Sequence, residues 1–367
     1  MKRSLRICAV LCAATAVASG LAPALASARS PWQVVYRHRF AAHSFSGFSV
    51  IAPGGRGEMW AAGGYGVAGN GLAGAVLWRN HRWHVTPVPD PGTLGAITGL
   101  SADSASDAWA VTANGYVLRW DGRQWRIAKR LAEPQGGPPG DEPTGVLAIN
   151  ARNVWVFYAT WRDSHNHVHG GALHDLNGTW REATGPGRTI IAASEATPAD
   201  LWAIGGTGSH VGLLHHEQRG WKPVTAQALT GLTFASILAL RRGPVWALGW
   251  PSAGTGPAEL VELSSGRWTG HPLPAAIKQA NFLLGATELA SDGHAGIWVA
   301  APAFYPHSGH LLHLARGRWQ QIALGANVNA HSVVAVPRSH TLCAAGSADN
   351  YNATSATALV WSTASAC

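Results

Sequence analysis

The sequence predicts an all-β fold, a seven-bladed β-propeller, and three observations predict it. A tryptophan that follows a polar turn recurs six times at spacings of 44 to 52 residues, and a cysteine takes its place in a seventh unit. A second tryptophan marks the last of four strand-like segments in each of the first six units. The seventh unit lacks that last segment, and an isolated strand-like segment precedes the first unit. Four-stranded repeats of this length are typical of propellers, because one small sheet cannot bury both of its faces alone.

The clearest unit runs from Ile97 to Trp125. It contains a small apolar strand, a polar turn, a strand opening near Trp109, and a strand ending at Trp120 before an Asp-Gly turn. The first tryptophan column contains Trp60, Trp109, Trp155, Trp202, Trp246 and Trp298, with Cys343 in the seventh place. The second column contains Trp83, Trp125, Trp180, Trp221, Trp268 and Trp319, and a third contains Trp78, Trp120 and Trp361. We expect the blades near residues 45–88, 94–130, 143–184, 188–226, 232–274, 282–324 and 330–361, within a domain that spans 29–367.

The isolated segment Pro31–Val35 has the pattern of a last strand and contains Trp32. We expect it to complete the seventh blade, which would close the ring by joining the two ends of the chain. Sixteen tryptophans, counting Trp32, then belong to the scaffold, where large aromatic rings bury apolar area between blades. The turn residues Asp103, Asp107, Asp200 and Asp292 are expected to accept hydrogen bonds from their own backbone.

The pattern Ser-x-x-Asp-x-Trp-Ala-Val followed by Leu-x-Trp-Asp-Gly-x-x-Trp, seen around Trp109 and Trp125, resembles repeats of exported actinobacterial propeller proteins. The resemblance covers essentially the whole mature chain. It implies the propeller fold and export, and it implies no particular activity.

The first 28 residues have the pattern of a secretory signal peptide. Lys2, Arg3 and Arg6 form a basic start, an apolar stretch follows, and small residues near Ala26 and Ala28 offer a cleavage site. No later run of apolar residues is long enough to span a membrane. We therefore expect a secreted, extracellular, monomeric protein without a membrane span. Removal of the signal takes away three positive charges, so the net charge of +8 falls to about +5. This mild excess favours anionic cell-wall polymers over nucleic acid, which we do not expect as a partner.

Removal of the signal also leaves two cysteines, Cys343 and Cys367. Two cysteines in an oxidising compartment suggest one disulfide, although spacing alone does not show that they meet.

The two tryptophans outside the repeat columns, Trp161 and Trp250, fall in loops between the second and third strands of blades three and five. Further aromatic residues fall in the corresponding loops of other units: Tyr65, Phe304, Tyr305 and Tyr351. Loops on a rigid scaffold are where binding residues gather. These six residues are candidate ligand-binding positions for sugar rings, and the alternative is that they cover the core as lids.

The loop of the third blade contains Asp163, His165, His167 and His169. Histidines at alternate positions of an extended segment project to one side, and with a carboxylate they could bind zinc, copper or nickel. A solvated polar loop without a cofactor is the alternative.

Two classes of function follow. The first is a non-enzymatic recognition module that binds a cell-wall glycan or an exported protein through its irregular loops. The second is an extracellular hydrolase or lyase, with or without the assistance of a divalent metal, in the loops of the third blade. A glycosidase needs two carboxylates on either side of a cleft. The chain has only 19 acidic residues, and no nucleophile triad or phosphate loop stands out, so we assign no catalytic residues.

Overall fold

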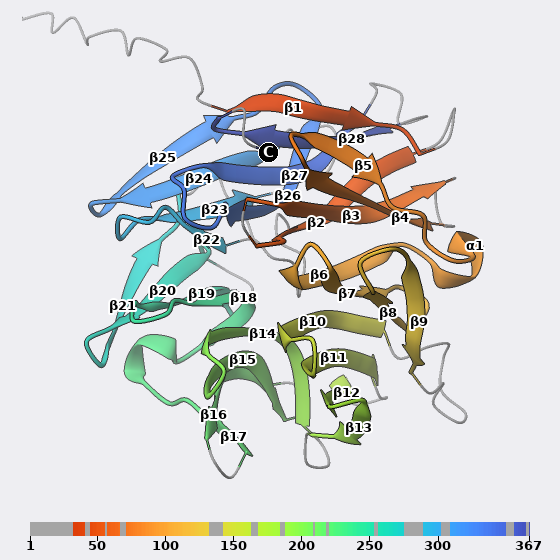
Figure 1. Cartoon of the computed structure of the whole chain (residues 1–367). Coiled ribbons are helices and arrows are strands. Elements are labelled where there is room, and N and C mark those ends of the chain that lie inside the picture. The colour runs from red at the N-terminus through yellow and green to blue at the C-terminus, as the bar shows by residue number, and fades with distance from the viewer. Residues whose placement is uncertain are drawn as a thin grey trace, which may run out of the picture.

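Seven four-stranded antiparallel sheets form a ring in the computed structural model of this chain (Figure 1). The structure describes residues 32–40, 45–55, 57–66, 71–131, 142–162, 168–183, 188–207, 210–217, 220–252, 256–274, 289–301, 309–349, 356–364 and 367. In these residues, the helical segments are α1 (Pro91–Leu94) and η1 (Gln227–Leu229), and no helix has the length and apolar character of a membrane span.

Each blade takes four strands in order from the inside of the ring outward. The first blade contains β2 (Phe45–Pro53), β3 (Met59–Gly66), β4 (Leu72–Arg79) and β5 (Arg82–Val85). The second contains β6 (Ile97–Ser104), β7 (Asp107–Thr112), β8 (Tyr116–Trp120) and β9 (Trp125–Arg130). The third contains β10 (Glu142–Asn150), β11 (Asn153–Arg162), β12 (Val168–Leu176) and β13 (Thr179–Glu182). The fourth contains β14 (Arg188–Thr197), β15 (Asp200–Thr207), β16 (His210–Glu217) and β17 (Gly220–Pro223).

The fifth contains β18 (Leu232–Ala239), β19 (Val245–Pro251), β20 (Glu259–Ser264) and β21 (Arg267–Pro272). The sixth contains β22 (Leu289–Ser291), β23 (Ile297–Ala301), β24 (His310–Ala315) and β25 (Arg318–Ala323). The seventh contains β26 (Val328–Ala335), β27 (Leu342–Asp349), β28 (Ala356–Ser362) and, outermost, β1 (Gln33–His38).

The ring closes as the sequence predicts. The N-terminal strand β1 pairs antiparallel with β28, with Gln33 opposite Ser362 and His38 opposite Ala358. Figure 1 shows this joint as the red first strand beside the dark blue last strand. Pairing the two ends of the chain in one sheet makes the ring continuous without a covalent link, because the backbone groups of β28 find partners in β1. The prediction of a seven-bladed propeller with this closure is confirmed.

The two main tryptophan columns meet between neighbouring blades. Trp60 of the first blade is fully buried, and its ring lies edge-to-face on Trp125 of the second blade, with centroids 5.3 Å apart. Four further pairs repeat this contact at centroid distances of 5.4 to 6.3 Å: Trp109–Trp180, Trp155–Trp221, Trp202–Trp268 and Trp298–Trp32. Each pair joins the second strand of one blade to the outer strand region of the next. The repeat in the sequence is therefore a repeat of blade-to-blade contacts.

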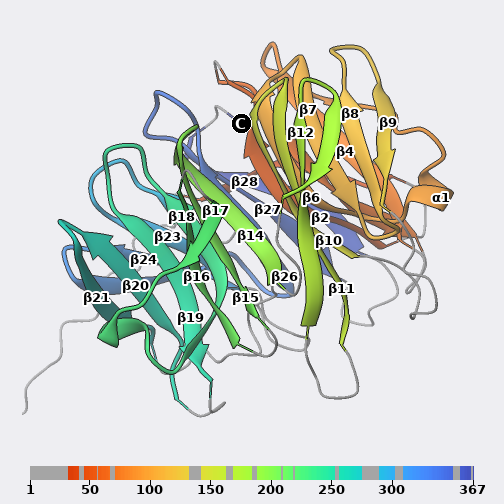
Figure 2. The same ribbon diagram turned by 90° about the horizontal axis from the view of Figure 1, so that it is seen from below.

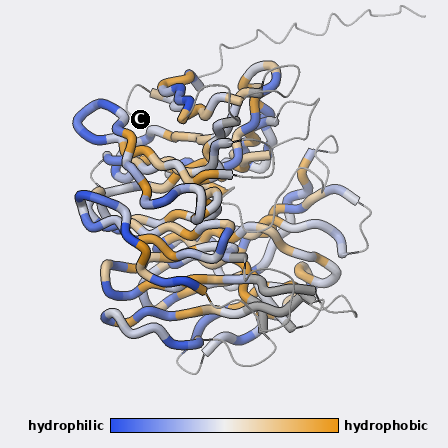
Figure 3. Tube along the Cα trace, turned by 90° about the vertical axis from the view of Figure 1, so that its right-hand side faces the viewer, coloured by the Kyte–Doolittle hydropathy of each residue, from blue (hydrophilic) through white to orange (hydrophobic). Residues whose placement is uncertain are grey.

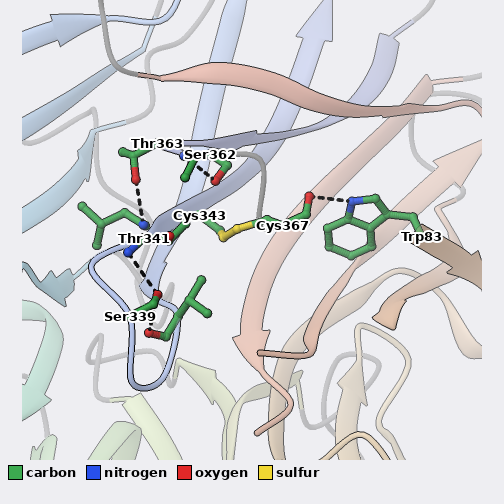
Figure 4. The surroundings of a disulfide bond; sticks show 10 residues. Trp83, Ser339, Thr341, Cys343, Ser362, Thr363 and Cys367 are labelled. Atoms are coloured by element: carbon green, nitrogen blue, oxygen red, sulfur yellow. Dashed lines mark hydrogen bonds between the residues drawn. A yellow bond between two sulfur atoms is a disulfide. The ribbon is translucent and has the colours of Figure 1, made fainter. Parts of the chain in front are cut away.

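A disulfide occupies the joint between the seventh and first blades. Cys343 on β27 takes the place of the column tryptophan and is bonded to Cys367, and both residues are fully buried (Figure 4). Trp83 of the first blade donates its indole N–H to the carbonyl oxygen of Cys367 at 3.0 Å. The disulfide between Cys343 and Cys367 thus occupies the space that a column tryptophan fills between other blades. The expected Cys343–Cys367 bond is present.

The inner strands enclose a central cavity. Residues from the innermost strands of all seven blades line a volume of about 410 Å³. Hydroxyl groups join these strands around the ring: Ser101 accepts the backbone N–H of Ala148, and Ser194 accepts that of Ala239, each at 2.9 Å. Figure 2 shows the same blades seen from below. Figure 3 shows hydrophobic strands within the blades and hydrophilic turns at their ends.

Candidate functional site

The antiparallel order of the strands gives the ring two different faces. The loops that enter each blade lie at the same end as the loops between its second and third strands, and we call this end the loop face. The turns between first and second strands, and between third and fourth strands, lie at the other end, the turn face. Three of the aromatic candidates predicted from the sequence, Tyr65, Trp161 and Trp250, stand near the loop-face ends of β3, β11 and β19.

Five aromatic rings cross the joint between the seventh and first blades. Trp83 stacks on Tyr36 at a centroid distance of 5.2 Å, and Tyr36 lies parallel to His38 at 5.8 Å. Phe40 then meets His38 edge-to-face at 4.5 Å and stacks on Tyr65 at 5.1 Å. We call these five residues the aromatic ladder. Because Tyr65 is the next-to-last residue of β3, the ladder reaches the loop face at this end.

The members of the ladder next to the loop face are available to a ligand. Phe40, Tyr65 and His38 are each partly exposed. Burial lowers the pKa of His38 and raises the pKa of Tyr36, so both side chains are neutral near pH 7. The ladder therefore presents an uncharged aromatic surface.

One glycine fixes the position of this surface. A Cβ atom at Gly74 of β4 would lie 2.7 Å from the ring of Phe40, so no larger residue fits beneath that ring. The sequence prediction named Tyr65 and missed Tyr36, His38 and Phe40. The alternation of these three residues along the chain places them on one side of an extended segment, and this was the available signal.

Trp250, the second predicted ligand-binding tryptophan, lies in the core. It is 8% exposed on β19 and packs in one cluster with Ala258, Leu273 and Leu289, between the fifth and sixth blades. This location matches the lid alternative, because a buried indole ring has no free face for a sugar.

The remaining candidates fall outside the residues or side chains that the structure describes. Phe304, Tyr305, Tyr351, Asp163, His165 and His167 lie outside the described residues. Trp161 and His169 belong to β11 and β12, but their side chains are not among those described. Among the described residues, no three His, Cys, Asp or Glu side chains gather closely enough to hold a metal ion. The metal site of the third blade thus stays a prediction.

Several histidines and acids that the sequence did not connect form pairs beside the column tryptophans. His215 of β16 stacks on Trp202 at a centroid distance of 4.4 Å and binds a carboxylate oxygen of Asp200 at 2.9 Å. In the second blade Arg119 takes the same place, bound to Asp107 at 3.0 Å. Asp107 and Asp200 therefore bind side chains of the third strand, and the expectation that they serve their own turns is wrong. The strand register explains the difference, because it places the third-strand residue directly opposite the tryptophan.

In the sixth blade, Asp292 binds both the backbone of its own turn and a side chain of the third strand. Asp292 accepts the backbone N–H groups of His294 and Gly296 in its own turn, as predicted, and also binds His313 at 2.9 Å. Burial raises the pKa of Asp292, but these hydrogen bonds outweigh that effect, so the pKa lies below its usual value. The ring of His313 lies flat on Trp298 at 4.2 Å. Such pairs brace the second and third strands of a blade, and we assign them no catalytic role.

Comparison with protein-family models and with curated proteins finds no match to this sequence. Comparison with solved structures finds propellers. The WD40 β-propeller domain of Doa1 shares 9% identity and a TM-score of 0.58, over 90% of this chain and 97% of that one. YCF48 bound to the D1 peptide shares 15% identity and a TM-score of 0.56, over 90% and 96%. The Cps50 (Swd1) propeller domain of Myceliophteria thermophila shares 10% identity and a TM-score of 0.56, over 89% and 98%. At such low identities the likeness concerns the fold alone.

Proposed function

We propose that this chain is an exported, non-enzymatic recognition module that binds a cell-wall glycan or an exported protein through its loop face. The aromatic ladder is the observation that carries the proposal. It holds partly exposed, uncharged rings against a rigid ring of blades, so that few degrees of freedom are lost when a ligand stacks on them.

A glycan is the ligand that the ladder suits best. Phe40 and Tyr65 stack on each other with centroids 5.1 Å apart and planes 20° apart, and both rings stay partly exposed, so a ligand meets the open side of an aromatic stack. Sugar rings present flat apolar C–H faces of this kind, and the two rings require no charged partner. A protein ligand is supported by the solved YCF48 propeller, which binds a peptide.

A glycan array separates the two ligands. The mature chain is expected to bind a defined set of glycans, and a variant with Phe40→Ala and Tyr65→Ala is expected to lose at least tenfold in affinity. The matched control is His294→Ala, which removes an exposed aromatic ring on the turn face and should leave binding unchanged. If the wild-type chain binds no glycan, the sugar proposal fails. Capture from culture supernatant that depends on the same two residues then tests the protein ligand.

Export is tested separately. Expression of the full chain in a host with a general secretion pathway should release protein that begins near Ser27 or Arg29, as read by N-terminal sequencing. Retention of the full-length chain inside the cell would contradict export.

A further inference from the structure

The central cavity has properties of a second ligand site that is independent of the loop face. Innermost strands of all seven blades line its volume of about 410 Å³, which lies within the range of small-molecule sites. Most of the lining is apolar and includes the partly exposed Leu147, Leu238 and Leu240. Side chains of this kind contact the aliphatic part of a ligand and leave its orientation to a few polar groups.

One ionisable side chain lines this cavity among the described residues, and that is Glu195 of β14. Its Oε2 atom is buried and has no hydrogen-bond partner in the described part of the chain. A buried carboxylate oxygen without a donor costs free energy, and a cation beside the exposed part of the same carboxylate offsets that cost. No lysine, arginine or histidine stands among the lining residues to serve as that donor.

A second carboxylate adds to the negative charge at this place. Burial raises the pKa of Glu195, and the negative charge of Asp103 on β6 raises that pKa further. The two carboxylates therefore lie close enough to repel each other. Asp103 is exposed near the end of β6, and Glu195 stands near the end of β14, so both carboxylates lie towards the turn face. The whole chain is basic, with 27 Lys and Arg against 19 Asp and Glu, which makes this acidic spot unusual.

Two of the four serines that line the cavity have hydroxyl groups held by a neighbouring blade. Ser101 and Ser194 each accept a backbone N–H from the next blade, which holds their oxygen atoms in place. Each hydroxyl keeps one lone pair for a further donor. A ligand with several N–H groups thus finds both a carboxylate and fixed hydroxyl oxygens.

From these observations we propose that the central cavity binds an organic cation, an amine or guanidinium group with an aliphatic stem, whose charged end pairs with Glu195. The N–H groups of such a ligand pair with the part of the Glu195 carboxylate that faces the cavity, and its stem packs against the apolar wall. A hard metal ion fits less well, because it requires about six oxygen ligands and a single carboxylate lines the cavity.

Calorimetric titration of the mature chain with N-acetyl-lysine methylamide tests the proposal. We expect saturable binding of this probe at millimolar concentration and no binding of N-acetyl-norleucine methylamide, which keeps the stem and lacks the amine. Glu195→Gln should weaken binding of the lysine probe at least tenfold. The matched control Glu217→Gln removes an exposed carboxylate that pairs with Lys222 on the outside of the fourth blade, and it should leave binding unchanged.

Two further readouts keep the test decisive. Glu195→Gln should fold, since it removes a buried charge, and Asp103→Asn at an exposed position should weaken binding severalfold if Glu195→Gln does not fold. Binding should weaken as the pH falls, because the cation selects the ionised form of Glu195. Equal affinity for wild type and Glu195→Gln, equal affinity for the two probes, or no binding of the lysine probe would overturn the proposal. Loss of binding in the Phe40→Ala and Tyr65→Ala variant would also overturn it, since that variant changes the loop face alone.

Discussion

Loss of the disulfide is the perturbation whose effect can be worked out most directly. Cys343 and Cys367 are separated by 24 residues, and cross-linking a loop of that length lowers the entropy of the unfolded chain by an amount worth about 3.4 kcal/mol at 25 °C. For roughly 300 ordered residues, that loss corresponds to a fall of about 5 °C in Tm. A double variant with alanine at both positions should therefore melt about 5 °C below the oxidised wild type, and more if the C-terminal residue leaves its place beside Trp83.

Thermal unfolding followed by circular dichroism is the assay. Added reductant should lower the Tm of the wild type to that of the double variant and should not change the variant itself. Trp83→Phe is the companion variant, since it keeps an aromatic ring and removes the indole N–H that donates to the carbonyl oxygen of Cys367. A loss of about 1 kcal/mol is expected from it. If the double variant melts within 1 °C of the oxidised wild type, the reasoning that the C-terminal residue seals this joint is wrong.

Three other predictions concern the scaffold, its response to pH and the third blade. Trp60→Ala should destabilise the chain by about 3–5 kcal/mol in denaturant unfolding, because it empties a fully buried contact between two blades; a loss below about 1 kcal/mol would contradict the scaffold role of the columns. Burial lowers the pKa of His331 to about 4, below the 6.5 expected in the unfolded chain, so its contribution to stability is complete above pH 6.5 and is lost as the pH falls towards 4. Protonation of His331 should therefore make the chain about 2 kcal/mol less stable at pH 5 than at pH 7. In urea titrations at the two pH values, His331→Gln should remove that difference. Bound metal, measured by mass spectrometry, should fall when His165, His167 and His169 are replaced by alanine, and equal, negligible metal in both proteins would end the metal hypothesis.

The fold was predictable because its signal is repeated along the chain. Every blade contributes its own tryptophans and turns, so an error in one unit does not change the period. The closing strand was also visible, since the sequence has one strand too few at its end and one too many at its start. The physical reason is that small sheets need neighbours, and the sequence records that need locally in each unit.

The partners of individual side chains were predictable only in part. The spacing of Cys343 and Cys367 allowed a disulfide, and the ring geometry decides that they meet. The irregular position of Trp250 allowed either a ligand-binding ring or a lid over the core, and packing between two blades buries it. Local sequence gives the order of strands, while the rotation between neighbouring blades decides which faces become interior.

By itself, the sequence determined the number of blades, the place of the joint and the role of the tryptophan columns. Only the tertiary structure decided that five first-column tryptophans pack on a tryptophan of the next blade, that Phe40 stacks on Tyr65, and that Glu195 lines a central cavity. The tryptophan contacts and the cavity combine residues from different blades. They exist only after seven sheets close into a ring, because no single unit contains both sides of a contact between blades.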